Sequence, residues 1–206
     1  FTMSVLYLAS ESPRRKELLE RAGFRFQVFP VKVSENIEKN LTLDEQIQRI
    51  ADTKLEAFLQ QYKSLKSDDF YVIAADTMVV FEGIALGKSE TRQKASETLE
   101  RLSGQWHEVK TALTVGQWQR EGQRLNLRHQ VVTSSVRFKK LSLKEISDYL
   151  ESGEADDKAG SYGIQGRARS FILEVEGPYD NIVGLPVQSV KAMLQSLDFL
   201  FAEVQS

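Results

Sequence analysis

Apolar residues follow two different periods along this chain, and the changes of period predict its elements. Near-continuous apolar runs at residues 5–10 and 70–81 indicate buried strands. Alternating apolar and polar positions at 24–33, and again from Trp106 to Phe138, predict further strands. The helical period of 3.6 residues predicts helices, and these cover 13–22, 43–62, 89–104, 142–153 and the segment from Pro186 to Phe201.

Residues at the ends of these segments support the assignment. Ser12 and Pro13 have the pattern of an N-cap and a first helical residue, and Ser142 with Glu145 forms a capping box. Glu121-Gly122 predicts a hairpin turn. Because strands and helices alternate over 206 residues, we expect an α/β fold, with a mixed twisted sheet flanked by helices in one domain (1–206) that has two lobes.

Composition excludes several classes of function. A net charge of −2 gives no general attraction to nucleic acid or to an anionic membrane. The absence of cysteine excludes disulfides, thiolate metal sites and cysteine nucleophiles, and two histidines are too few for a multi-histidine metal site. No apolar run approaches the ~18 residues that span a bilayer, and the first residues, FTMSVLYL, lack the basic region of a signal peptide. We therefore expect a cytoplasmic protein without a nucleic-acid or membrane partner.

Arg14 and Arg15 stand at the start of a predicted helix, where the backbone is already positive. The free N–H groups of a helix start bind phosphate, and two guanidinium groups add paired donors for phosphate oxygens. The alternative is a solvated pair that forms salt bridges with Glu11 or Glu17.

Lys54 and Asp76 are charged residues at positions where the pattern is apolar. Lys54 falls within the apolar stripe of its helix, so it faces the interior or a cleft, unless its stem packs and its ammonium reaches water. Asp76 lies inside VIAADTMVV, and alternation puts it on one face with Ala74 and Met78. A carboxylate there is a candidate general base or metal ligand, or else it caps a turn at the end of the strand.

Three further candidates are Gln165 in a glycine-rich segment, Lys88 after a single glycine and Glu35 after a predicted strand. Gln165, in DKAGSYGIQG, offers both a donor and an acceptor for the edge of a nucleobase, although the segment by itself could be an ordinary turn. Lys88, in LGKSET, is a second possible phosphate contact or simply a surface lysine, and Glu35 could join Asp76 at a divalent cation. Side chains that could bind phosphate, carboxylates that could bind a metal ion and an amide that could recognise a nucleobase together fit a nucleoside triphosphate.

Five motifs give the chain a family resemblance over nearly its whole length: LASESPRRKELL, AADTMVV, LGKSETRQKASETLERLSGQWHEVKTAL, DKAGSYGIQG and NIVGLPV. In these it resembles the Maf family of nucleoside triphosphate pyrophosphatases. The resemblance implies a Maf/ITPase-like fold with a deep nucleotide cleft, a divalent cation (Mg²⁺ or Mn²⁺) and a homodimer. It also implies substrate-binding residues, namely Ser10, Arg14, Arg15, Lys54, Thr77, Lys88 and Gln165, with Asp76 as the catalytic base and Glu35 and Asp76 as metal ligands.

The resemblance extends to a subclass. Arg14, Thr77 and Gln165 match the members that act on dTTP and UTP, whereas the subclass acting on 7-methyl-GTP tends to carry Trp, Gln and Glu there. Ser89 departs from the family, which usually has proline after the lysine, and we expect it to loosen the loop of Lys88. Arg167 and Arg169 also depart from the small residues usual after Gln-Gly.

The resulting hypothesis is hydrolysis of dTTP and UTP, and of modified pyrimidine triphosphates, to monophosphate and pyrophosphate. Asp76 takes a proton from the water that attacks the α phosphorus, although a metal-bound Asp76 could not act as a free base. Two alternatives remain, a nucleotide-binding regulator of cell division without turnover and a nucleic-acid binder. The mild negative charge and the lack of an aromatic-basic face argue against the second.

Overall fold

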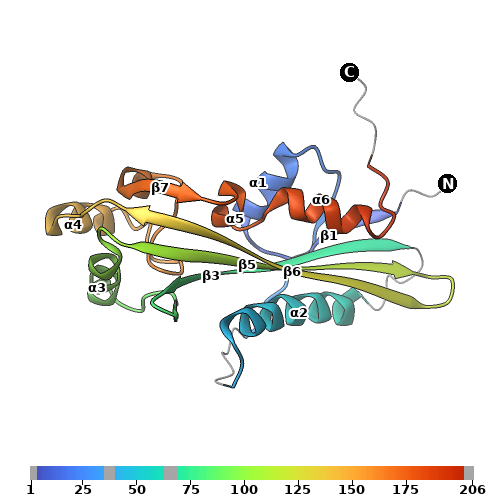
Figure 1. The fold of residues 1–206 in the computed structure, drawn as a ribbon. Helices are drawn as coiled ribbons and strands as arrows, with labels where there is room; N and C mark the ends of the chain where they lie inside the picture. Colours follow the sequence, from blue (N-terminus) through green and yellow to red (C-terminus); the bar gives the residue numbers. More distant parts are fainter. Residues whose placement is uncertain (1–3, 35–39, 63–68, 202–206) are drawn as a thin grey trace. The chain divides into compact units, whose positions relative to one another are not determined.

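The computed structural model describes residues 4–34, 40–62 and 69–201. The chain forms a mixed α/β structure (Figure 1). Its strands are β1 (Val5–Leu8), β2 (Gln27–Val28), β3 (Phe70–Phe81), β4 (Ile84–Leu86), β5 (Trp106–Gln119), β6 (Arg124–Phe138) and β7 (Ile172–Glu176). Its helices are α1 (Pro13–Arg21), α2 (Leu43–Gln61), α3 (Arg92–Leu102), α4 (Leu143–Glu151), the 3-10 helix η2 (Arg167–Phe171), α5 (Tyr179–Val183) and α6 (Val187–Gln195).

The strands pair in the order β2-β1-β3-β5-β6-β7, with β4 added to β3. β1 runs parallel to β2 and β3, whereas β4 is antiparallel to β3 and β7 to β6. The mixed sheet flanked by helices is therefore confirmed.

The chain divides into two compact units that share the long strands. Unit 1 comprises 1–76, 112–131 and 184–206, and unit 2 comprises 77–111 and 132–183. β3, β5 and β6 each pass from one unit to the other. The single domain predicted for 1–206, with a cleft for a nucleotide, stays a prediction.

Unit 1 has helices on both faces of its strands (Figure 1). Alternation along β3 sends Tyr71, Ile73 and Ala75 into a core with α1 and α6, and sends Phe70, Val72 and Ala74 into a second core with α2. The sequence of β3 is a nearly continuous apolar run because helices cover both of its faces.

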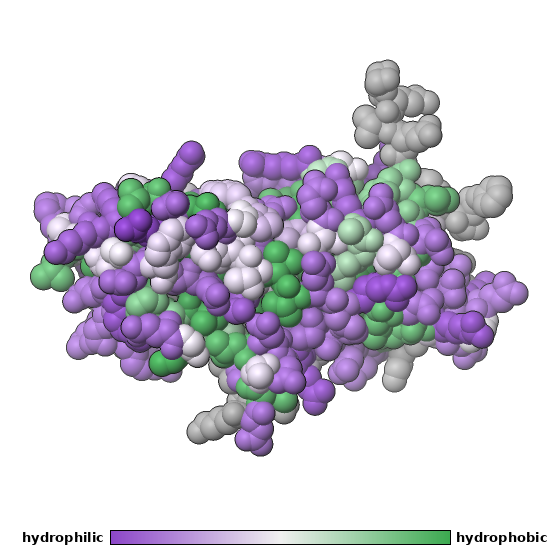
Figure 2. All heavy atoms as spheres, in the orientation of Figure 1, coloured by the Kyte–Doolittle hydropathy of each residue, from purple (hydrophilic) through white to green (hydrophobic). Residues whose placement is uncertain are grey.

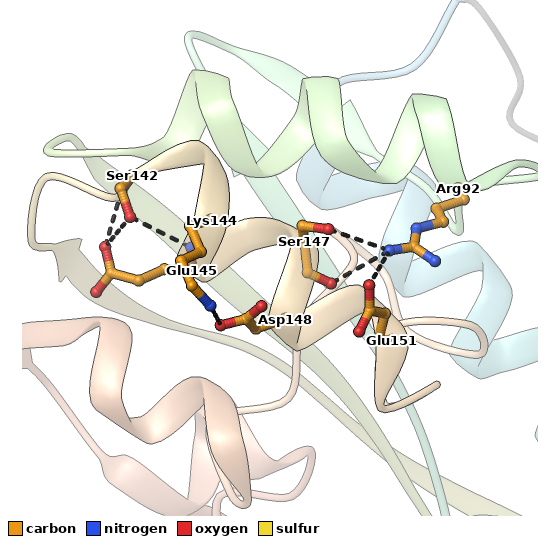
Figure 3. Close-up of polar contacts among 7 residues, drawn as sticks. All are labelled: Arg92, Ser142, Lys144, Glu145, Ser147, Asp148 and Glu151. Carbon is orange, nitrogen blue, oxygen red and sulfur yellow. Dashed lines mark hydrogen bonds and ion pairs between the residues drawn. The ribbon is translucent and has the colours of Figure 1, made fainter.

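Unit 2 carries α3 and α4, which pack against each other. Arg92, at the start of α3, binds α4 through the carbonyl and hydroxyl of Ser147 and the carboxylate of Glu151, each at 3.3 Å (Figure 3). The predicted capping box of Ser142 and Glu145 starts α4. The Arg92 contacts fix the start of α3 against α4, and the capping box fixes the residue at which α4 begins.

Most predicted elements are confirmed, with differences at their ends, and the short elements β4, β7, η2 and α5 were not predicted. In the described part of the alternating segment 24–33, the strand is limited to Gln27–Val28, which pairs with Tyr7 and Leu8 at the end of β1. Ser12 is the N-cap of α1, but its side chain makes no capping bond, and its N–H donates to the Ser10 hydroxyl at 3.1 Å. The last helix ends at Gln195, before the predicted apolar positions Leu197 and Phe201.

The visible face of the molecule is mainly hydrophilic, with small hydrophobic clusters (Figure 2). Such scattered apolar groups are ordinary for a protein surface. Within the described residues, no helix combines the length and the apolar composition needed to cross a membrane.

His107 is the buried histidine of unit 2, with 3% of its surface exposed. Its Nε2 lies 2.7 Å from the hydroxyl of Tyr162, and its ring meets Phe138 edge to face at 4.9 Å. Burial lowers the pKa of His107 to about 4 from an ordinary value of 6.5. The imidazole is therefore neutral in the folded protein at pH 7.

This burial predicts a pH-dependent stability. Between pH 6.5 and 4 the unfolded chain binds a proton at His107 that the folded chain does not, so the free energy of unfolding falls as pH falls through this window. The full loss from this group is about 3 kcal/mol. Urea unfolding of His107→Gln at pH 7, 5.5 and 4.5 should show a decline smaller by most of this amount, whereas the exposed-site control His129→Gln should keep the wild-type decline. The same decline in wild type and His107→Gln would contradict the assignment.

Candidate functional site

Ser10 and Arg15 lie together where β1 ends and α1 begins. Arg15 is 8% exposed, although it is an arginine in the first turn of a helix. Its Nε donates to the carbonyl oxygen of Gly184 at 2.8 Å, and its Nη1 donates to the Ser10 hydroxyl at 3.3 Å. The Arg15 guanidinium therefore ties the start of α1 to the segment that precedes α6.

Arg14 differs from its neighbour. It is half-buried, and among the described residues it has no hydrogen-bond or ion-pair partner. The first turn of α1 contains no acidic residue, and Glu11 and Glu17 pair instead with Lys32 and Arg21. The alternative of salt bridges to these two glutamates is therefore wrong for Arg14, and binding of an anion by Arg14 at the positive end of α1 stays a prediction.

Lys54 and Asp76 form an ion pair inside unit 1. The Lys54 Nζ lies 2.5 Å from Asp76 Oδ1, and the side chains are only 11% and 13% exposed. Helical spacing puts Lys54 beside Leu55 and Phe58 on the buried side of α2, and strand alternation turns Asp76 toward the same core as Ala74. Because β3 continues to Phe81, Asp76 does not cap a turn at the end of the strand, and Lys54 ends on a carboxylate rather than in water.

The second oxygen of Asp76 differs from the first in its hydrogen bonding. Within the described part of the chain, Oδ2 makes no hydrogen bond. A carboxylate held by one oxygen can accept a proton or bind a cation through the other. The described residues contain no cluster of three or more His, Cys, Asp or Glu side chains that could hold a metal, and the predicted ligand Glu35 lies outside them.

In unit 2, Thr77 belongs to a hydrogen-bonded chain of polar groups. The hydroxyls of Thr77 and Thr111 are 2.9 Å apart, and Thr111 donates to the backbone carbonyl of Asn181 at 3.0 Å. The Thr111 hydroxyl has only one proton, so it accepts from Thr77. The Asn181 amide donates to the Val109 carbonyl and the Ser134 hydroxyl, both at 3.0 Å.

Sequence reasoning gave no role to Thr111, Asn181 or Gly184. Thr111 and Asn181 are fully buried polar residues, and the Gly184 carbonyl holds Arg15. The sequence could have indicated a role for Asn181, because it is a polar residue at the start of the apolar motif NIVGLPV and a buried polar residue needs hydrogen-bond partners.

The glycine-rich segment carries Gln165 on the surface. Gln165 is exposed, and none of the described residues forms a hydrogen bond with its side chain. Gly160 and Gly166 have φ values of +67° and +81°, and a Cβ on them would lie 2.9 Å from Val79 Cγ1 and 2.6 Å from Glu154 Oε2. These two glycines are thus required by the packing of the segment itself.

Lys88 is also exposed, and its side chain has no hydrogen-bond or ion-pair partner among the residues described. Its backbone forms an isolated antiparallel bridge with Ala159. The structure therefore brings Ser10 together with Arg15, and Lys54 with Asp76, in unit 1. Thr77, Lys88 and Gln165 all belong to unit 2.

Comparisons with known proteins agree with this arrangement of motifs. The dTTP/UTP pyrophosphatase of Bdellovibrio bacteriovorus is 48% identical over 189 residues, which cover 92% of this chain and 96% of that protein. The dTTP/UTP pyrophosphatase of Neisseria meningitidis serogroup A is 40% identical and covers 96% of each chain. A solved nucleoside-triphosphatase (dITP/XTP pyrophosphatase) from Mycobacterium abscessus covers 64% of this chain and 72% of its own at 11% identity, and its TM-score of 0.28 is too low to support an argument.

The family model described as Maf-like protein matches residues 5–197, from the first residue of β1 to two residues beyond α6. That match contains Arg14, Lys54, Asp76 and Gln165, and it places this chain in the Maf family.

Proposed function

We propose that this protein hydrolyses dTTP and UTP, and modified pyrimidine triphosphates, to the nucleoside monophosphate and pyrophosphate. The relatives named dTTP/UTP pyrophosphatase support the reaction and the substrates. The buried ion pair of Lys54 and Asp76 is the observation that carries it. A carboxylate kept in a strand covered on both faces is expensive to bury, and use in catalysis explains its presence.

In the proposed reaction, Asp76 Oδ2 accepts a proton from the water that attacks the α phosphorus, and pyrophosphate leaves. Lys54 holds the other oxygen at 2.5 Å, so the carboxylate has a fixed orientation toward that water. Arg14, Arg15 and Lys88 stabilise the negative charge of the triphosphate. Arg14 is the best placed for this role, because Arg15 already donates to Gly184 and Ser10.

A divalent cation, Mg²⁺ or Mn²⁺, belongs to the proposal. Asp76 offers one buried carboxylate, which fits the preference of Mg²⁺ for one or two carboxylates with phosphate oxygens and water. Asp76, with Glu35 as the second predicted ligand, would hold the ion, which would neutralise phosphate charge. While it binds the ion through Oδ2, Asp76 could not also act as the free base, so the two roles would belong to different states of the site.

Thr77 and Gln165 are proposed to select a pyrimidine base. Uracil and thymine present one N–H donor between two carbonyl acceptors, and the Gln165 amide offers the complementary donor and acceptor. Its exposure leaves this amide accessible to a ligand. A homodimer located in the cytoplasm remains part of the hypothesis.

The decisive experiment is incubation of the protein with Mg²⁺ and, in parallel, dTTP, UTP, CTP, GTP or 7-methyl-GTP, with chromatography of the products. Monophosphate and pyrophosphate from dTTP and UTP alone are expected. Diphosphate and phosphate would mean that the bond cleaved is a different one. Tight nucleotide binding without product would favour the non-hydrolysing regulator.

Replacement of Asp76 by Asn removes the proposed base while keeping its size. Turnover of dTTP should fall by at least ~10²-fold. The matched control is Asp148→Asn. Asp148 also pairs with a lysine, at 2.7 Å from the Nζ of Lys144, but this pair lies on the surface. The steady-state rate of this control should equal that of wild type, and full activity in Asp76→Asn would remove Asp76 from the mechanism.

Replacement of the two adjacent arginines should affect two different quantities, substrate binding for Arg14 and stability for Arg15. Arg14→Ala should raise KM for dTTP by ~10- to 100-fold through loss of a charge-assisted contact, with unchanged stability. Arg15→Ala should lower the free energy of unfolding by ~1–3 kcal/mol, because the Gly184 carbonyl loses its donor. Arg21→Ala, which breaks an exposed pair with Glu17 on the same helix, is the control for both measurements. Equal effects of the first two variants on KM and on unfolding would contradict this division.

A further inference from the structure

Two segments of unit 2 that carry proposed ligand contacts are joined to each other. The segment 86–89 contains Lys88, and the segment 158–166 contains Gln165. Lys88 and Ala159 form an antiparallel bridge, and the N–H of Gly160 donates to the carbonyls of Leu86 at 3.1 Å and Gly87 at 3.2 Å. One side-chain contact accompanies these backbone bonds, between the hydroxyls of Ser89 and Ser161 at 2.6 Å.

Ser161 has a backbone conformation that is unusual for a serine. Its φ is +60°, it directly follows Gly160 at +67°, and none of its surface is exposed. A non-glycine residue in the left-handed region is strained and persists where its surroundings compensate. A buried hydroxyl also needs a hydrogen-bond partner, and Ser89 supplies it. The Ser89–Ser161 bond thus supports the turn at its most strained residue.

The chain after this turn is fixed at several points before and after Gln165. The Tyr162 hydroxyl bonds to His107, and the N–H of Gly163 donates to the Tyr149 hydroxyl at 3.4 Å. Beyond Gln165, the N–H of Arg167 donates to Glu154 at 3.0 Å. Since these anchors belong to unit 2, the backbone of Gln165 has little freedom relative to Ser161, and Ser161 is bonded to the residue next to Lys88.

We propose that the Ser89–Ser161 bond is a positioning contact that makes the Lys88 segment and the Gln165 segment one rigid element. The expected loosening of the Lys88 loop by Ser89 is then reversed, because the serine hydroxyl provides the restraint. The inference rests on the proposed function, in which Lys88 contacts phosphate and Gln165 contacts the base. Its role is to hold both contacts at a fixed spacing, so it acts on substrate binding rather than on the attacking water.

The two hydroxyls are not equivalent. Ser89 is partly exposed, so its hydroxyl can bond to water when Ser161 is replaced. The Ser161 hydroxyl is fully buried, so removal of Ser89 leaves it without a partner. Ser89→Ala is therefore expected to disturb the element more than Ser161→Ala does.

The test compares Ser89→Val with Ser89→Thr, which have the same size and differ in one hydroxyl. Three quantities are measured: the KM and kcat for dTTP and, without substrate, the exchange rate of the Gly160 amide hydrogen. For Ser89→Val we expect a KM raised about 3- to 10-fold, kcat within about twofold of wild type, and faster Gly160 exchange. Ser89→Thr should restore all three values. Ser147→Ala, which removes a hydroxyl bonded to Arg92 elsewhere in unit 2, should leave them unchanged.

A double-variant cycle separates positioning from general stability. The increase in KM caused by Lys88→Ala should be smaller in the Ser89→Val background than in wild type, because Lys88 there is already misplaced. Equal KM and equal Gly160 exchange in Ser89→Val and Ser89→Thr, or full additivity with Lys88→Ala, would overturn the inference.

These outcomes are distinct from failure of the proposed function. If the wild-type protein binds dTTP without turnover, the dissociation constant replaces KM in the same comparison and the exchange measurement is unaffected. Absence of any dTTP binding by wild type would overturn the ligand-positioning role together with the proposed function.

Discussion

A charged carboxylate in the middle of a strand with two covered faces is the constraint on which unit 1 depends. Burying a charge is costly unless an opposite charge and hydrogen bonds compensate it. Removing one partner of a buried ion pair lowers stability more than replacing both partners by apolar residues. Asp76 therefore requires Lys54, and Lys54 requires α2 to lie at one position along β3.

The contacts of α2 meet this requirement. Phe58 packs against Tyr7 and Phe70, with ring centroids 5.4 Å and 5.7 Å apart. On another side of the helix, Gln48 donates to the Thr114 hydroxyl at 2.7 Å, and Thr114 donates to Asp52 at 2.5 Å. Aromatic packing and directional polar bonds thus fix the rotation and the translation of α2, and with them the geometry of the ion pair.

The sequence predicted the long elements because their periods are unambiguous. It singled out Lys54 and Asp76 because each interrupts an apolar pattern, but it left open whether the Lys54 ammonium reaches water and whether Asp76 caps a turn. It could not predict that they pair, since the contact depends on how α2 packs across β3. The same limit applies to Arg15, whose partner Gly184 lies 169 residues away in the chain. β4, β7 and η2 were not predicted, because segments of three to five residues carry too little pattern to separate strand from loop. Ser89 shows a different limit. Its departure from the family suggested a looser loop, but its hydroxyl bonds to that of Ser161, a long-range contact that the residues around Ser89 do not predict.

The division of the long strands has a consequence for how this protein can be altered. The chain passes from one unit to the other at 76/77, 111/112, 131/132 and 183/184, so neither unit is a continuous stretch of sequence. A truncated gene or a single proteolytic cut cannot release either unit intact, and recombination cannot exchange one unit for that of another protein by joining at a single point. Variation in such a protein is expected to accumulate by point substitution rather than by exchange of a whole unit.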